Sequence, residues 1–272
     1  KGIYKIFMMK QYLVIGNPIE HSLSPKLHNY WIKKNNINAI YDKKKINENE
    51  LENIILEVKK GKISGINVTV PFKKAVIPFL DELSTEANKT QSVNTIYINN
   101  GKIIGHNTDA AGFELAIKYL KYNIKNKRIF ILGAGGVAPS IIFSLLKMQP
   151  SKIFLSNRNR DKAENLRDLF KNLEIVNWGE IPNFDMIVNA TSLGLKEDDE
   201  IKLDFSNSGS DKFFYDIIYN PKQTNFLKKA KNLGHKTENG KMMFIYQAHQ
   251  AFTLWHKIMP DIDSKTINLL DQ

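Results

Sequence analysis

The sequence predicts an α/β protein of two domains, the second built on a parallel, doubly wound sheet. Short apolar runs alternate with helical patterns along most of the 272 residues, which is typical of strand–helix–strand units. The apolar run Arg128–Leu132 leads directly into the turn Gly133–Gly136 and then a helical pattern, and the apolar run Lys152–Ser156 follows. A strand, a glycine turn, a helix and a second strand in this order predict a doubly wound sheet.

The first half contains expected strands and helices of ordinary length. Apolar runs predict strands at residues 11–16, 39–42 and 63–70, and a hairpin of 93–98 with 102–105 around the turn Asn99-Asn100-Gly101. Helices are expected at 24–34, where Pro25 occupies the first turn, at 47–60, and in a short segment after Pro71.

The second half continues the alternation. Thr108 is expected to cap a helix that ends near Lys121. Further helices are expected after Gly136 as far as Lys147 and at 161–170, 224–233 and 241–257, with strands at 186–189 and 213–216. The polar, aperiodic segment 196–210 predicts a surface loop.

Composition excludes several classes of protein. Hydrophobic residues make up 42% of the chain, enough for buried cores, and the absence of cysteine excludes disulfides and thiolate chemistry. The net charge of +11 comes mostly from scattered lysines without interleaved arginine or aromatic residues, so we expect no nucleic-acid partner. No apolar run reaches the roughly 18 residues of a membrane span, so no membrane partner is expected. The six histidines lack paired ligand spacing, so no metal is expected.

The segment 1–7 is short and basic and lacks the apolar stretch of a signal peptide. Met8 and Met9 follow it directly. We interpret it as a tag remnant or an alternative start, and we expect a cytoplasmic protein.

The glycine turn predicts a dinucleotide site. Residues 133–138 match Gly-x-Gly-x-x-Ala between a strand and a helix, the context that this motif requires. The first glycine permits the tight turn, the second lets a pyrophosphate approach the main chain, and Ala138 permits close packing of helix on strand. The alternative is a glycine turn that serves packing alone.

The end of the next strand indicates which dinucleotide is bound. An acid there would bind the ribose 2′-hydroxyl of NAD, but the chain has Asn157-Arg158-Asn159 followed by Lys162. A guanidinium can hold a 2′-phosphate with two hydrogen bonds, so these residues favour NADP. The alternative is exposed basic residues at a helix start, a position where the helix dipole disfavours cations.

Polar clusters in the first half lie at expected strand ends and helix starts, where α/β folds bind ligands. Hydroxyl, amide and carboxylate groups of this kind suit a polyhydroxy carboxylate. Other roles stay open: Ser24 as an N-cap, Asn67 and Thr69 as partners of the local main chain, and Asp109 as a complement to a helix dipole. The clusters are Asn17–Pro25, Asn67–Lys73, Asn94-Thr95 and Asn107–Asp109.

The chain resembles shikimate dehydrogenases along nearly its whole length. Eight segments occur in the order of that family, which makes the resemblance specific. They are Gly16–Pro25, Asn67–Lys73, Val93–Thr95, Asn107–Gly112, Gly133–Gly136 with Asn157-Arg158, Asn189–Gly194, Asp216–Pro221 and Gln247–Trp255.

The resemblance implies an NADP-dependent oxidoreductase acting on a CH–OH group. Its reaction would be the reversible, NADPH-dependent reduction of 3-dehydroshikimate to shikimate in chorismate and aromatic amino-acid biosynthesis. It implies Lys73 and Asp109 as the catalytic pair. Substrate contacts would come from both of these and from Ser22, Ser24, Asn67, Thr69, Asn94, Tyr219 and Gln247.

The resemblance also implies the cofactor residues and the domain limits. A substrate-binding domain would cover 1–108 and be completed by the helices of 240–272, which would pack back on it, and a Rossmann NADP-binding domain would cover 109–239. The protein would be a monomer or homodimer. The NADP site would be lined by Gly133, Ala134, Gly135, Gly136, Val137, Ala138, Asn157, Arg158, Asn159, Lys162, Thr191, Ser192, Ile217 and Gly240.

Two other functions remain open from the sequence. A quinate/shikimate dehydrogenase using NAD would be favoured by an acid at the end of the second cofactor strand. A non-enzymatic Rossmann module that senses a nucleotide would not need both Lys73 and Asp109, and a turnover assay separates it from an enzyme.

Overall fold

The computed structural model describes residues 8–271, so segment 1–7 and its interpretation lie outside the described residues. The chain divides into two compact units. The first unit comprises Lys1–Thr108 and Gln247–Gln272, and the second comprises Asp109–Tyr246. The return to the first unit was expected at residue 240, but it occurs at Gln247, inside helix α8 (Lys241–His256).

The first unit contains a mixed sheet of six strands. Their order is β2-β1-β3-β5-β6-β4, with β1 parallel to β2 and β3, and β5 antiparallel to β3 and β6. The predicted hairpin is confirmed: Asn100 and Gly101 have φ values of 50° and 75°, as a two-residue type I′ turn requires. The strands are β1 (Lys10–Gly16), β2 (Ala39–Lys45), β3 (Gly65–Val68), β4 (Glu82–Leu83), β5 (Thr95–Asn99) and β6 (Lys102–His106).

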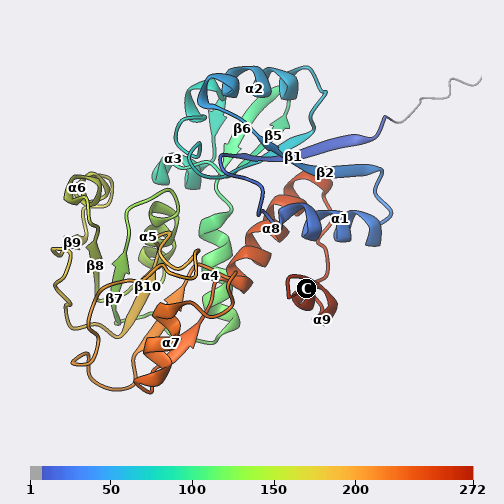
Figure 1. The fold of residues 1–272 in the computed structure, drawn as a ribbon. Coiled ribbons are helices and arrows are strands. Elements are labelled where there is room, and N and C mark those ends of the chain that lie inside the picture. The colour runs from blue at the N-terminus through green and yellow to red at the C-terminus, as the bar shows by residue number, and fades with distance from the viewer. Residues whose placement is uncertain (1–7, 272) are drawn as a thin grey trace, which may run out of the picture. The chain divides into compact units, whose positions relative to one another are not determined.

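Helices cover both faces of this sheet (Figure 1). Alternate residues of β1 point to opposite faces. Ile15 packs in a core with residues of α2 (Leu51–Lys59), and Tyr12 packs against Trp255 of α8 with ring centroids 4.9 Å apart. α1 (Ser24–Lys34) lies on the α8 face, where its Trp31 contacts Phe252. Short elements complete the unit: η1 (Glu48–Glu50), η2 (Ile77–Phe79), α3 (Thr85–Thr90) and α9 (Ser264–Leu269).

The second unit contains a fully parallel sheet of six strands. The order β12-β11-β10-β7-β8-β9 confirms the predicted doubly wound topology, because the chain runs outward from β7 first on one side and then on the other. The strands are β7 (Arg128–Leu132), β8 (Lys152–Ser156), β9 (Leu173–Ile175), β10 (Met186–Asn189), β11 (Phe213–Asp216) and β12 (Lys236–Glu238). Ligands bind such sheets where the order reverses, here at the carboxyl ends of β7 and β10.

Alternation along β11 shows how helices cover this sheet. Phe214 contacts Phe226 of α7 (Asn225–Asn232), with ring centroids 5.3 Å apart, and Tyr215 contacts Phe113 of α4 (Asp109–Tyr119) on the opposite face, 5.4 Å apart. The remaining helices are α5 (Ala138–Lys147) and α6 (Arg160–Leu169). No helix within residues 8–271 is both long and apolar enough to span a membrane.

Two expectations differ from the structure. The segment after Pro71 forms turns followed by the 3₁₀ helix η2 rather than an α-helix, and Pro78 inside η2 cannot donate a helical hydrogen bond. The loop 196–210 has no helix or strand, but its side chains at Ile201, Leu203 and Phe205 are buried in the core beneath α7. The prediction that this loop lies entirely at the surface is therefore wrong.

Candidate active site

The loop between β1 and α1 carries Ser22 and Ser24. Ser24 is buried and is the first residue of α1, whereas Leu23 is the N-cap and makes no side-chain cap bond. The alternative role of Ser24 as an N-cap is therefore excluded. Ser22 Oγ accepts a hydrogen bond from Ser24 N at 3.3 Å, so the Ser22 hydroxyl keeps its own proton for an outside acceptor.

Glu20 fixes the same loop to β2. Main-chain hydrogen bonds and the ammonium of Lys45, 3.2 Å from Glu20 Oε1, lower the pKa of the Glu20 carboxyl to about 2. Lys43 Nζ also donates to Glu20 O. The loop that presents the two serines is thus held by neighbouring charges on the edge strand.

Asn67 and Asn94 belong to a buried polar network at the ends of β3, β5 and β6. Asn67 Nδ2 donates to Asn94 O at 3.1 Å and to Thr95 Oγ1 at 3.0 Å. Asn94 Nδ2 donates to Thr108 Oγ1 at 2.8 Å, and Asn94 Oδ1 accepts from Thr108 N at 2.7 Å. The structure therefore brings Asn67 and Asn94 together, and it commits both amino hydrogens of Asn67 to the protein itself.

Tyr41 joins this network to the serine loop, although nothing in the sequence indicated it beyond a tyrosine in a short strand. Its hydroxyl donates to Asn67 Oδ1 at 2.7 Å and is hydrogen-bonded to the Ser24 hydroxyl. Burial raises the pKa of this hydroxyl well above its ordinary value, so it stays protonated. Ser24, Tyr41, Asn67 and Asn94 form one continuous polar chain.

Lys73 and Thr69 follow β3, and both are half-buried. Val93 N donates to Lys73 O at 2.8 Å, and Thr69 N donates to Ile15 O at 3.0 Å, so the main chain is fixed to the segment before β5 at Lys73 and to β1 at Thr69. Gly16 permits the approach of β1 to Thr69, because a Cβ at Gly16 would lie 2.5 Å from Thr69 Cγ2. Asp109 is buried and begins α4 in the second unit, directly after Thr108.

The glycine loop of the second unit fits a dinucleotide. Gly133 needs its glycine for the fold: its φ is +105°, and a Cβ there would lie 2.8 Å from Ala190 C. Gly135 has an ordinary φ, and a Cβ there would meet no atom within 4 Å, so packing does not require a glycine. No side chain caps α5 and its first turn holds no acidic residue, which leaves its positive end available to an anion.

The second cofactor segment lies next to this loop. Asn157 Oδ1 accepts from Ala134 N at 3.2 Å, and Asn157 Nδ2 donates to Asn159 O at 2.8 Å. Asn159 caps α6 by accepting from Lys162 N. These bonds tie the end of β8 to the glycine loop.

Two neighbouring arginines differ in their partners. Arg160 Nε donates to Glu164 Oε1 at 2.9 Å, and Arg160 also donates to Asn177 Oδ1. The exposed side chains of Arg158 and Lys162 make no hydrogen bond or ion pair with any residue in 8–271. Their charges are therefore not neutralised by the described protein, as a 2′-phosphate site requires.

Asn189 and Asp216 form a network that sequence reasoning missed, although each is the polar last residue of a buried strand. Asn189 Nδ2 donates to Asp216 Oδ1 at 3.1 Å, and Asn189 Oδ1 accepts from Thr191 N at 3.0 Å. Asp216 also accepts from Thr224 Oγ1 at 2.6 Å and from Ile218 N at 3.0 Å. Burial raises the pKa of the Asp216 carboxyl to about 6.

The remaining expected residues lie around this network or on α8. A Cβ at Gly240 would lie 1.9 Å from Ile217 O, so these two expected cofactor residues are in direct contact. Ser192 is exposed beside Thr191, and Tyr219 packs on Phe244 with ring centroids 4.5 Å apart. Gln247 lies half-buried on α8, in the first unit.

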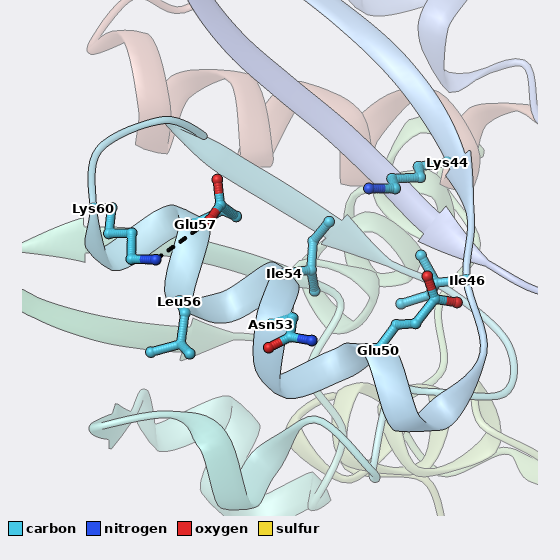
Figure 2. A pocket seen from close by; sticks show the side chains of 8 residues that line it. All are labelled: Lys44, Ile46, Glu50, Asn53, Ile54, Leu56, Glu57 and Lys60. Atoms are coloured by element: carbon cyan, nitrogen blue, oxygen red, sulfur yellow. Dashed lines mark ion pairs between the residues drawn. The ribbon is translucent and has the colours of Figure 1, made fainter.

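Two cavities lie away from these residues, one on each unit. Figure 2 shows one of about 190 Å³ on the first unit, where residues from the end of β2 face residues of η1 and α2. Glu57 at its wall is ion-paired with Lys60 and Lys62. This cavity of the first unit is smaller than usual ligand pockets, which have roughly 300–1,000 Å³. A second, open cavity of about 620 Å³ is lined by α7 and the loop before β11, and it holds none of the expected site residues.

Comparisons with known families match both halves of the chain. Residues 14–96 match the shikimate dehydrogenase substrate binding domain, and residues 114–222 match the shikimate / quinate 5-dehydrogenase family. A shikimate dehydrogenase (NADP(+)) of Pelagibacter ubique (strain HTCC1062) is 61% identical over 264 residues, which cover 97% of this chain and 100% of that protein.

Solved structures agree in fold and length. The crystal structure of shikimate dehydrogenase from Aquifex aeolicus has a TM-score of 0.89 at 39% identity and covers 97% of this chain and 98% of that one. Shikimate 5-dehydrogenase from Thermus thermophilus, in complex with NADP(H) and shikimate, has a TM-score of 0.88 at 30% identity, with coverage of 97% and 99%. The two-domain α/β fold, with a substrate-binding N-terminal domain and a Rossmann-like NADP domain, is that of these relatives, and the chain belongs to the shikimate dehydrogenase family.

Proposed function

We propose that this oxidoreductase catalyses the reversible, NADPH-dependent reduction of 3-dehydroshikimate to shikimate, a step towards chorismate and the aromatic amino acids. One observation carries the proposal beyond family membership. The same protein carries a glycine loop open to a dinucleotide, hydrogen-bonded to Asn157 next to Arg158, and a buried chain of hydroxyl and amide groups. Val93, which directly precedes Asn94 of that chain, is hydrogen-bonded to the main chain of Lys73.

The first unit would hold the substrate. Ser22 and Ser24 suit its carboxylate, because Ser22 has a proton for an outside acceptor. Asn67 can take a ring hydroxyl only through Oδ1, since both its amino hydrogens are committed. The other contacts proposed in the first unit are Thr69, Lys73, Asn94 and Gln247, and two more, Asp109 and Tyr219, are proposed from the second unit.

Lys73 and Asp109 would handle the proton. Reduction of a ketone to an alcohol needs a hydride at carbon and a proton at oxygen, and bound NADPH supplies the hydride. The Lys73 ammonium would donate a hydrogen bond to the substrate oxygen at C3 and give it the proton, with Asp109 as the proposed second member of the catalytic pair.

The second unit would hold NADP. Gly133, Ala134, Gly135, Gly136, Val137 and Ala138 present main chain and helix start to the pyrophosphate. Arg158 and Lys162 would bind the 2′-phosphate, with Asn157 and Asn159 shaping the segment that carries them. Thr191, Ser192, Ile217 and Gly240 would line the rest of the site. A cytoplasmic location, the absence of a nucleic-acid partner, and a monomeric or homodimeric state stay predictions.

The test is a turnover assay with purified protein that follows reduced-cofactor absorbance in four parallel reactions. These combine shikimate or quinate with NADP⁺ or NAD⁺. Rapid turnover confined to shikimate with NADP⁺ is expected. Preference for NAD⁺ or quinate would replace the proposal with a quinate/shikimate dehydrogenase, and no turnover by folded protein in any reaction would favour a nucleotide-sensing module.

A further inference from the structure

Tyr41 lies at the middle of the polar chain, yet no role in the reaction has been given to it. Its hydroxyl has the Ser24 hydroxyl on one side and Asn67 Oδ1, 2.7 Å away, on the other. Ser24 belongs to the proposed carboxylate side of the substrate site and Asn67 to the proposed ring-hydroxyl side. Tyr41 is therefore the group that connects the two sides.

Two other residues of α1, His28 and Asn29, hold the Tyr41 ring and main chain without using its hydroxyl. Asn29 Nδ2 donates to Tyr41 O at 2.7 Å, and Asn29 Oδ1 accepts from Tyr41 N at 2.9 Å. The His28 ring stacks on the Tyr41 ring, with centroids 4.2 Å apart and planes 2° apart. Because backbone and ring are fixed independently, the hydroxyl can change its hydrogen-bond partner without moving the side chain.

The direction of each hydrogen bond in this polar chain follows from which atoms carry a proton. Asn67 Oδ1 can only accept, so the Tyr41 proton points to Asn67 and the Tyr41 oxygen accepts from Ser24. A substrate carboxylate, which also only accepts, competes with Tyr41 for the single proton of Ser24. When Ser24 donates to the carboxylate, the Tyr41 oxygen loses its donor, and the Ser24 oxygen becomes a second acceptor, besides Asn67 Oδ1, for the Tyr41 hydroxyl.

We propose that Tyr41 is a positioning residue whose hydroxyl turns from Asn67 to Ser24 when the substrate carboxylate binds. The turn polarises Ser24 towards the carboxylate and leaves Asn67 Oδ1 to a ring hydroxyl of the same substrate. Recognition of the carboxylate and of the hydroxyl is thereby coupled. The inference rests on the proposed function, because it takes shikimate as the ligand that carries both groups.

Steady-state kinetics of Tyr41→Phe, Ser24→Ala and the double variant test the coupling. Without the Tyr41 hydroxyl, Ser24 lacks the donor that would polarise it towards the carboxylate. The KM for shikimate should therefore rise roughly 3- to 10-fold in Tyr41→Phe, which is the usual contribution of one hydrogen bond to binding. The kcat and the KM for NADP⁺ should change less than about twofold. In the Ser24→Ala background, Tyr41→Phe should raise the KM for shikimate by a clearly smaller factor. The Tyr41 hydroxyl then has no serine hydroxyl to which it could donate a hydrogen bond.

Tyr12→Phe is the matched control. It removes one hydroxyl from a buried tyrosine of the same aromatic cluster, which packs against Trp255 and lies outside the polar chain. It should leave all kinetic constants unchanged, and thermal melting of both phenylalanine variants shows whether they fold alike. If Tyr41→Phe does not fold, Asn29→Ala supplies the second test: it frees the Tyr41 main chain and should raise the KM for shikimate in the same direction.

The inference is overturned if Tyr41→Phe behaves like Tyr12→Phe, or if the effects of Tyr41→Phe and Ser24→Ala simply multiply. Failure of the proposed function looks different, since the unmodified protein itself would then not oxidise shikimate.

Discussion

At the scale of single residues, the proposed site residues differ from nearby residues of the same type in their burial and in their partners. Lys73 is half-buried in the segment after β3, where its carbonyl oxygen accepts from Val93 N, whereas its neighbour Lys74 is exposed. Arg158 has no partner among residues 8–271, whereas Arg160 is bound to Glu164 and Asn177. Lys74 and Arg160, nearby residues of the same type, therefore provide matched controls for the proposed roles of Lys73 and Arg158.

Replacing Lys73 should remove the proton-transferring group. We expect Lys73→Ala to lower kcat for shikimate oxidation by roughly 10²- to 10⁴-fold, the usual contribution of an acid–base group. Initial rates with saturating NADP⁺ measure the effect, and Lys74→Ala should retain full activity. Equal rates in the two variants would remove Lys73 from the mechanism.

Replacing Arg158 should change cofactor choice rather than the chemistry. Loss of a charge-assisted contact to the 2′-phosphate should raise the KM for NADP⁺ roughly 10- to 100-fold and leave the KM for NAD⁺ nearly unchanged. Arg160→Ala serves as the control. If Arg158→Ala raised the KM for NADP⁺ and the KM for NAD⁺ by the same factor, Arg158 would not bind the 2′-phosphate.

At the scale of elements, the buried parallel strands could be predicted to the residue. Arg128–Leu132, Lys152–Ser156, Met186–Asn189 and Phe213–Asp216 all have the predicted bounds, because each is an apolar run of ordinary strand length. The short strands β4, β9 and β12 were not predicted. Each has two or three residues of mixed polarity and exists only through pairing with a neighbour, which local sequence does not encode.

The loop before β11, residues 196–210, was wrongly predicted to lie at the surface. Its polar composition predicted exposure, but Ile201, Leu203 and Phe205 at alternate positions are buried against the second sheet's core. Three apolar side chains in a polar segment are too few to reveal a period of two, although they are enough to anchor the loop.

The two glycines of the cofactor loop should respond differently to the same substitution. A Cβ at Gly135 meets nothing, so Gly135→Ala should melt like the unmodified protein, while its methyl group obstructs the pyrophosphate and raises the KM for NADP⁺ about 10-fold or more. Gly133→Ala should lower the melting temperature, because of its positive φ and its contact with Ala190. A Gly135→Ala variant with normal NADP⁺ kinetics would place the cofactor elsewhere.

The network that joins β10, β11 and α7 should give the protein a measurable pH dependence. Burial raises the pKa of Asp216 from 3.8 to about 6, so the folded state favours the protonated carboxyl. The stability this provides is present below about pH 4 and is lost as the pH rises through about 6, at roughly 1.4 kcal/mol per pKa unit, or about 3 kcal/mol in all.

Asp216→Asn should remove that dependence. Urea unfolding at about pH 4 and about pH 8 gives the free energy of unfolding of each protein. The difference in this free energy, unmodified protein minus Asp216→Asn, should fall by about 3 kcal/mol between the two conditions. If the two proteins changed in parallel, Asp216 would titrate normally in the folded state.

At the scale of the whole molecule, the sequence predicted the two-domain α/β fold, because apolar runs and helical patterns alternate in either unit. The assignment of site residues stays a prediction. The sequence did not predict the internal partners. Tyr41 lies in a short strand, and its hydrogen bonds to Asn67 and Ser24 join residues far apart in the chain, so only the folded sheet brings them together. The change of unit inside α8 was missed for a similar reason, because the helix pattern continues without a break at Gln247.

The central claim is that the first unit binds shikimate through this polar chain and the second unit binds NADP through the glycine loop. The most direct measurement is a crystal structure of the protein with shikimate and NADP⁺. We predict shikimate in contact with Ser22, Asn67 and Lys73, its C3 oxygen within hydrogen-bond distance of Lys73 Nζ, and the 2′-phosphate against Arg158. Shikimate bound away from Lys73, or a 2′-phosphate that does not contact Arg158, would contradict it.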